Sequence, residues 1–60
     1  MKIVLIKVLA PTVEGYKLDK WIYTQPLFVV EETEDHILVK HKWKIPTYAW
    51  FDKKYVDRYI

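Results

Sequence analysis

Residues 37–45 read ILVKHKWKI, and apolar and polar side chains alternate along most of this stretch. One face would carry Ile37, Val39, His41, Trp43 and Ile45, and the other Leu38, Lys40, Lys42 and Lys44. Because successive side chains of a strand point to opposite sides, this period of two predicts a half-buried strand of an antiparallel pair. Pro46 is expected to end or bend it.

Four further segments have the composition of short strands. Residues 3–9 are almost wholly apolar and hold four β-branched side chains before Pro11 closes the run, which predicts a strand covered on both faces. The other expected strands are residues 27–31 and 47–51, and residues 56–60 are expected to form a last short strand or a tail. Five strands and no long helix predict an all-β domain.

Two connections and one helical turn complete the expected chain. Residues 11–23 contain the only glycine, Gly15, and mix polar with aromatic side chains, which predicts a long loop or an irregular hairpin. Residues 31–35, EETED, predict a solvated hairpin turn or, alternatively, an acidic contact for a basic partner or a mimic of nucleic-acid phosphates. Residues 52–55 predict a single helical turn capped by the Asp52 carboxylate.

Length and composition limit the class of protein. A chain of 60 residues that is 52% hydrophobic and 17% aromatic predicts one folded domain over residues 1–60. The chain has no cysteine, so disulfides and thiolate metal sites are excluded. Residues 1–10 lack the pattern of a signal peptide, and no run reaches the roughly 20 apolar residues of a spanning helix. We therefore expect a cytoplasmic protein with no membrane partner.

The C-terminal part of the chain resembles an SH3 domain. Residues 49–56, AWFDKKYV, are similar to the SH3 segment in which a small residue and an aromatic pair precede a helical turn ending in Tyr-Val, and residues 27–38 resemble the middle of that domain more loosely. The resemblance implies a small SH3-like barrel of about five antiparallel strands and an interaction role, with Tyr55 as a surface aromatic. At the position of the ligand-stacking tryptophan of SH3 domains this chain has residues 37–38, and at the position of the binding-surface proline it has Asp52. The resemblance therefore does not imply recognition of proline-rich peptides.

Groups that could support catalysis or hold a metal are sparse. The chain has no serine, and His36 and His41 would point to opposite faces of a strand, where they cannot share a metal ion or a proton. We expect His36 in a turn and His41 half-buried beside Trp43. The carboxylates of residues 31–35 lack the spacing and the glycine of a calcium loop. No enzyme activity, cofactor, metal or small-molecule substrate is therefore expected.

The aromatic side chains are too many for the interior of so small a barrel. Phe28 and Trp43 are expected inside, and exposed Trp and Tyr are the side chains most enriched at protein interfaces. The expected protein-binding residues are Tyr16, Trp21, Tyr48, Trp50, Tyr55 and Tyr59. We predict a protein-binding module, and its small size would suit an inhibitor or regulator, such as the phage proteins that block host enzymes in the host cytoplasm. A homodimer is an alternative use of the same aromatic residues.

A nucleic-acid-binding barrel is the competing prediction. It would use a row of lysines spaced about 7 Å apart along one strand face, helped by neighbouring basic residues. The basic residues concerned are Lys40, Lys42, Lys44, Lys53, Lys54 and Arg58. Lysines on an outward face also keep a sheet soluble and block its association with other sheets, so the row is open to both interpretations.

Overall fold

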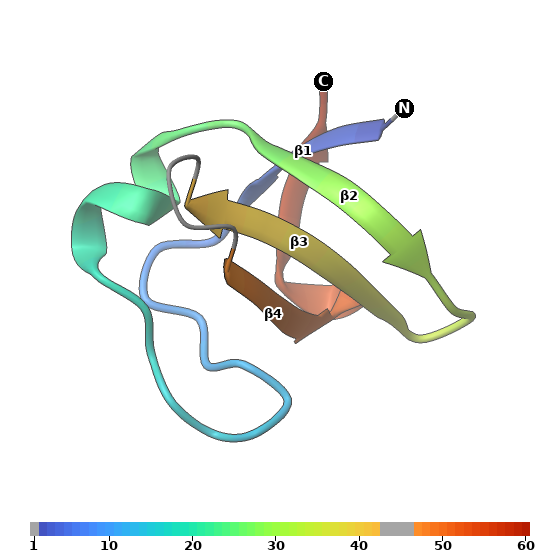
Figure 1. Ribbon diagram of the computed structural model, residues 1–60, viewed down its shortest axis with the longest axis horizontal. Coiled ribbons are helices and arrows are strands. Elements are labelled where there is room, and N and C mark those ends of the chain that lie inside the picture. Colours follow the sequence, from blue (N-terminus) through green and yellow to red (C-terminus); the bar gives the residue numbers. More distant parts are fainter. Residues whose placement is uncertain (1, 43–46) are drawn as a thin grey trace.

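The structure is a computed structural model, and it describes residues 2–42 and 47–60. These residues form five strands and two short 3-10 helices (Figure 1). In chain order they are β1 (Lys2–Ile6), η1 (Lys20–Thr24), β2 (Leu27–Glu32), β3 (His36–Lys42), β4 (Thr47–Asp52), η2 (Lys53–Tyr55) and β5 (Val56–Tyr59). The long segment from residue 7 to residue 26, which includes η1, is called the 7–26 connection below.

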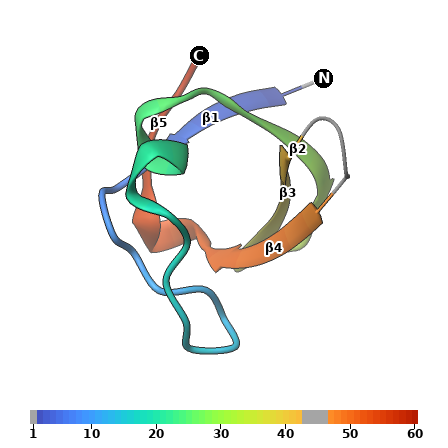
Figure 2. The same cartoon turned by 60° about the vertical axis from the view of Figure 1, so that its left-hand side comes forward.

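All five strands belong to one antiparallel sheet in the order β4-β3-β2-β1-β5. In a flat sheet the two edge strands would lie about 19 Å apart. Only η2 joins β4 to β5, and three residues of 3-10 helix rise about 6 Å. The sheet must therefore curl, and Figure 2 shows the resulting half-barrel. This confirms the all-β prediction, and the arrangement is compatible with an SH3-like barrel.

The two ends of the described chain meet in this sheet. β5 pairs with β1, with Tyr59 opposite Val4, and the Ile60 N–H donates to the Ile3 carbonyl at 2.8 Å. η2 is held in turn by the Lys53 N–H, which donates to the Asp35 carbonyl at 2.9 Å. These bonds connect β1, the β2–β3 turn and the last strand into one closed arrangement.

The core lies inside the half-barrel. Its buried residues come from all strands except β5 and from the 7–26 connection: Val4, Ile6, Ala10, Ile22, Tyr23, Leu27, Ile37, Val39, Ala49 and Phe51. Full burial of a side chain such as Ile or Phe contributes about 1.5–3 kcal/mol. This cluster is therefore the main source of stability among the described residues.

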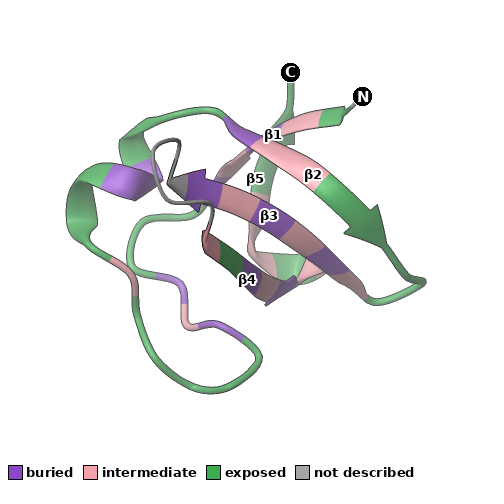
Figure 3. Cartoon of the chain, in the orientation of Figure 1, coloured by how far each residue is buried: buried purple, intermediate pink, exposed green. Residues whose placement is uncertain are grey.

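The alternation predicted for β3 is confirmed where the structure describes it. Ile37, Val39 and His41 are buried, and Leu38 and Lys40 between them are partly exposed (Figure 3). The rest of the stretch, including Trp43, Lys44 and Ile45, lies outside the described residues.

The expectation that Phe28 lies inside the barrel is wrong. Leu27 takes the inward position opposite Val4, so Phe28 faces the other side of β2 and is only partly buried. Phe51, on β4, supplies the fully buried ring instead. The alternation of β2 therefore determines which of its neighbouring apolar residues enters the core.

The first strand is shorter than predicted. β1 ends at Ile6, and the apolar run continues into a turn in which the Ala10 N–H donates to the Lys7 carbonyl at 3.1 Å. Val8 and Leu9 are exposed there, and Leu9 has a φ of 60°. Hydrophobicity alone did not indicate this turn, because leucine rarely adopts the left-handed backbone conformation.

The helical turn is present, but its expected cap is not. η2 covers Lys53–Tyr55 with Asp52 at the N-cap position, and the Asp52 side chain makes no capping hydrogen bond. Its carboxylate instead lies 4.0 Å from Nε2 of His36, the residue opposite it on β3. The predicted capping role of Asp52 is therefore wrong.

Candidate interaction surface

Tyr23 anchors the 7–26 connection to the core. Its buried hydroxyl donates to the Ala10 carbonyl at 2.7 Å and accepts from the Leu18 N–H at 2.9 Å. Its ring meets Phe51 edge-on, with centroids 6.4 Å apart. The Tyr23 side chain thus connects both arms of the connection to β4. The long segment therefore has a defined conformation.

The tip of the connection is a tight turn. The Thr12 N–H donates to the Tyr16 carbonyl at 2.8 Å, and the Gly15 N–H donates to the Thr12 carbonyl at 2.9 Å. Gly15 has a φ of 96°, which only glycine adopts readily. The irregular hairpin considered from the sequence is therefore present, and it holds Tyr16 in a defined position.

A backbone hydrogen bond joins this hairpin to the sheet. The Val13 N–H donates to the Trp50 carbonyl at 2.8 Å, so the hairpin lies along the edge strand β4. Val13 and Tyr16 on the hairpin are exposed, as is Tyr48 on β4. The hairpin and β4 are thus neighbours, and three of the expected protein-binding residues, Tyr16, Tyr48 and Trp50, come from these two segments.

The six aromatic residues expected at an interface fall into different environments. Tyr16, Trp21, Tyr48 and Tyr59 are exposed, whereas Trp50 and Tyr55 are partly buried. Tyr55 packs against the core, and the Lys54 ammonium lies 5.2 Å from its ring centroid. Tyr59 lies on β5, where the Lys2 ammonium lies 5.5 Å from its ring.

The outward side of β2, β3 and β4 carries Tyr48 and Trp50, which were expected at an interface, and further apolar side chains that were not. Strand register places Phe28, Lys40 and Tyr48 in one cross-strand row and Glu31, Leu38 and Trp50 in the next. Val30, at a bulge between Val29 and Glu31, is exposed next to these rows. We call these seven residues, Phe28, Val30, Glu31, Leu38, Lys40, Tyr48 and Trp50, the outer sheet face.

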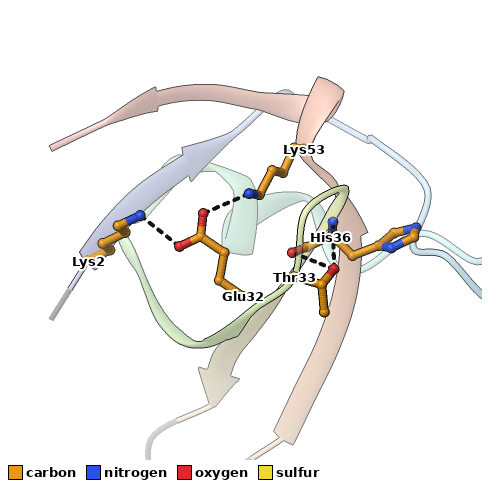
Figure 4. Close-up of polar contacts among 5 residues, drawn as sticks. All are labelled: Lys2, Glu32, Thr33, His36 and Lys53. Carbon is orange, nitrogen blue, oxygen red and sulfur yellow. Dashed lines mark hydrogen bonds and ion pairs between the residues drawn. The ribbon is translucent and has the colours of Figure 1, made fainter.

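Glu32 forms the centre of an ion-paired cluster (Figure 4). The bulge at Val30 turns Glu32 to the position opposite the buried Ile37. There its carboxylate accepts from Lys2 at 2.7 Å and pairs with Lys53 at 2.8 Å. The hydrogen bond from Lys2, followed by that from Lys53, lowers the pKa of Glu32 to about 2, and the same bond raises the pKa of Lys2.

The described basic residues of the nucleic-acid prediction lie on several elements of the fold. A register shift separates Lys40, which lies opposite Tyr48, from Lys42, which lies opposite Thr47. Lys44 lies outside the described residues. Of the remaining three, Lys53 pairs with Glu32, Lys54 lies on the Tyr55 ring and Arg58 is on β5.

The two histidines lie in separate environments. His36 begins β3, where its N–H donates to the Thr33 hydroxyl at 3.1 Å and its carbonyl accepts from the Thr33 N–H at 2.9 Å. His41 is buried. Within residues 2–42 and 47–60, no three His, Asp or Glu side chains are grouped so that they could hold a metal ion.

Comparison of the chain with protein-family models, with curated proteins and with solved structures finds no match. Across the described residues, none of the helices has the length and apolar character needed to cross a membrane. What the chain can do must therefore be argued from its own geometry.

Proposed function

We propose that this chain is a non-enzymatic protein-binding module built on an SH3-like barrel. Its contact surface would be formed by the hairpin tip of the 7–26 connection together with β4. The observation that carries this proposal is the hydrogen bond from Val13 to the Trp50 carbonyl, because it makes one surface from two segments that are far apart in the sequence.

The character of this surface fits a protein partner. Val13, Tyr16 and Tyr48 expose large apolar or aromatic side chains, and Trp50 is partly exposed beside them. Tyr and Trp are enriched among the residues that contribute most to binding energy. Tyr23 and the turn at Gly15 fix the backbone that carries these side chains. Little backbone entropy would therefore be lost when a partner binds.

Nucleic acid is the weaker candidate. Binding to phosphates requires several cations that converge on one surface. Here Lys53 is already paired with Glu32, and a shift of strand register separates Lys40 from Lys42. A role as an inhibitor or regulator of a host protein stays part of the proposal, since a chain of 60 residues would act by occupying a surface of something larger.

The test is affinity capture with the immobilised chain from bacterial lysate, with and without nuclease, followed by identification of the retained proteins by mass spectrometry. A stoichiometric protein that survives nuclease and is retained equally at low and high salt is the expected result. Capture that disappears with nuclease, or falls steeply with salt, would replace this proposal with nucleic-acid binding.

A matched pair of tyrosines then locates the surface. Tyr16 and Tyr59 are 47% and 49% exposed, so truncation removes a similar exposed ring at two places. Tyr16→Ala should weaken capture about tenfold or more, equivalent to about 1.4 kcal/mol, and Tyr59→Ala should leave it within about twofold. Equal effects of the two substitutions would place the contact elsewhere.

A further inference from the structure

The strand β4 forms one edge of the sheet (Figure 1), so half of its backbone N–H and C=O groups point away from β3. Two hydrogen bonds show which half. The Lys53 N–H, directly after β4, donates to the carbonyl of Asp35, which directly precedes β3. The Trp50 carbonyl accepts from Val13 of the hairpin and therefore points outward. Because these directions alternate along a strand, odd-numbered residues of β4 bond to β3 and even-numbered residues turn their backbone groups outward.

Tyr48 presents its backbone N–H and carbonyl on the part of this edge that the hairpin does not occupy. It lies two residues before Trp50, so its backbone groups point the same way. Among the described residues, the backbone hydrogen bonds outside the strand pairs include none to Tyr48. The hairpin therefore covers only part of the β4 edge, and the outward donor and acceptor of Tyr48 have no partner within the described chain.

The other edge strand, β5, has features that discourage a further strand, and β4 lacks them. Natural proteins protect sheet edges with short strands, charged side chains, proline or bulges. β5 is four residues long and carries Asp57 and Arg58. β4 is longer and has no charged residue or proline from Thr47 to Phe51, and the extra residue of its bulge lies in β3. Of the two edges, β4 is therefore the one suited to pair with another strand.

We propose that the protein partner binds by strand addition, with an extended segment of that partner pairing with β4 at Tyr48, beside the hairpin. This inference rests on the proposed function and specifies how the partner contacts β4. The Tyr48 N–H and carbonyl bond to the backbone of the added segment, in the way that Val13 already bonds to Trp50 at the next outward position.

The surroundings of Tyr48 define the chemistry of the segment. The Tyr48 side chain is on the outer sheet face and is exposed, so it lies beside the outward side chains of an added strand. Aromatic and β-branched side chains pair best with an aromatic ring across two strands. Because the hairpin occupies the position at Trp50, the added strand is only a few residues long. The segment is therefore short and extended, with a β-branched or aromatic residue beside Tyr48.

The probe for this edge is a random library of linear peptides, from which binders are selected on the immobilised chain. The selected peptides should slow hydrogen exchange of the Tyr48 N–H by about tenfold or more, as measured by NMR, because an added strand bonds to that group. A library that yields no binder, or binders that protect amides elsewhere and leave Tyr48 unchanged, overturns the proposal.

Replacing one backbone N–H with an ester oxygen, in chains made by chemical synthesis, tests the contact without changing a side chain. The ester at Tyr48 should weaken peptide binding about fivefold, the effect of one lost hydrogen bond. Tyr59 is the matched control, because it is an equally exposed tyrosine on the other edge strand and its N–H also points outward, next to the inward-bonded Ile60. The ester at Tyr59 should leave binding within about twofold. Equal effects of the two esters overturn the proposal, and thermal unfolding confirms that both chains are folded.

This inference and the proposed function fail separately when the two ester chains are also used in the lysate capture. Capture that Tyr16→Ala weakens and the Tyr48 ester leaves unchanged supports the proposed function and overturns strand addition. Peptide binding at Tyr48 with no protein captured supports strand addition and overturns the proposed function. Sedimentation velocity of the chain alone tests the other occupant of the edge: a dimer that the Tyr48 ester weakens would make it a second copy of the chain and overturn the proposal.

Discussion

The hydroxyl of Tyr23 is the polar group in the core whose role is best defined. It is buried, and it donates a hydrogen bond to the Ala10 carbonyl while accepting one from the Leu18 N–H. Two segments of the 7–26 connection therefore depend on one oxygen atom. A long segment without regular structure needs such a group, because its own backbone cannot satisfy all of its hydrogen bonds.

Tyr23→Phe should lower the free energy of unfolding by about 1–3 kcal/mol, since both backbone groups lose their partner while the ring stays in place. Urea denaturation measures the change. Tyr16→Phe, which removes a hydroxyl from an exposed ring, is the control and should shift stability by less than about 0.5 kcal/mol. Equal stability of Tyr23→Phe and the parent chain would contradict the anchoring role.

Leu9 is a second residue with a defined effect on stability, in this case through its backbone conformation. Its φ of 60° costs about 1–2 kcal/mol for a residue with a side chain. Leu9→Gly removes this strain but gives the unfolded chain more freedom, so the free energy of unfolding should rise by a net of about 0.5–1 kcal/mol. Leu9→Val should lower it, because a branched side chain tolerates this conformation least. The unfolding temperatures of the two variants should shift in opposite directions. A loss of stability in Leu9→Gly would show that the Leu9 side chain stabilises the fold by more than its backbone strain destabilises it.

At the scale of elements, Glu32 connects three parts of the fold. It lies on β2 and pairs with Lys2 of β1 and Lys53 of η2. These contacts lie at the side where β1 and η2 approach β2, and Figure 4 shows both lysines directed at the same carboxylate. The cluster therefore helps to hold the curl of the sheet.

The pH dependence follows from the lowered pKa of Glu32. The value of about 2 in the folded chain lies below the ordinary 4.5, so the carboxylate stabilises the fold above about pH 4.5, and this contribution is lost as the pH falls through about 2. Glu32→Gln should therefore be less stable than the parent chain at pH 7, and the difference should shrink towards pH 2. Thermal unfolding across this range measures it, with the exposed Glu34→Gln as control; a difference that stays constant with pH would contradict the ion-pair account.

The sequence predicted most of the elements but not their irregularities. Alternation identified β3, and Pro and polar clusters placed the turns, because side-chain period and backbone preference are local properties. The bulges at Val30 and His41 were not predictable, since they depend on how neighbouring strands twist. The bulge at Val30 also turns Glu32 inward, and for that reason the ion-paired cluster could not be expected from the EETED segment.

At the scale of the whole molecule, the fold class could be predicted and the surface only in part. Strand count and the turn before the last strand were sufficient for an all-β barrel-like sheet. Of the candidate aromatics, Tyr16 and Tyr48 are exposed as expected. Tyr48 and Trp50 of the outer sheet face were expected at a surface, whereas Phe28 and Leu38 were not, because the register that places Phe28 beside Lys40 and Leu38 beside Trp50 joins residues far apart in the sequence.

The pairing of β5 with β1 has a consequence for how the chain folds. The hydrogen bond from Ile60 to Ile3 joins residues at the two ends of the sequence, and contacts of such long range are slow to form because chain entropy is lost before they contribute. We expect refolding in milliseconds to seconds, the range of small all-β domains, as measured by stopped-flow tryptophan fluorescence. Refolding within microseconds would contradict this expectation. Until β5 has docked, β1 exposes an unpaired edge, so the interval before the ends meet is the one in which newly made chains are most exposed to proteases and to each other.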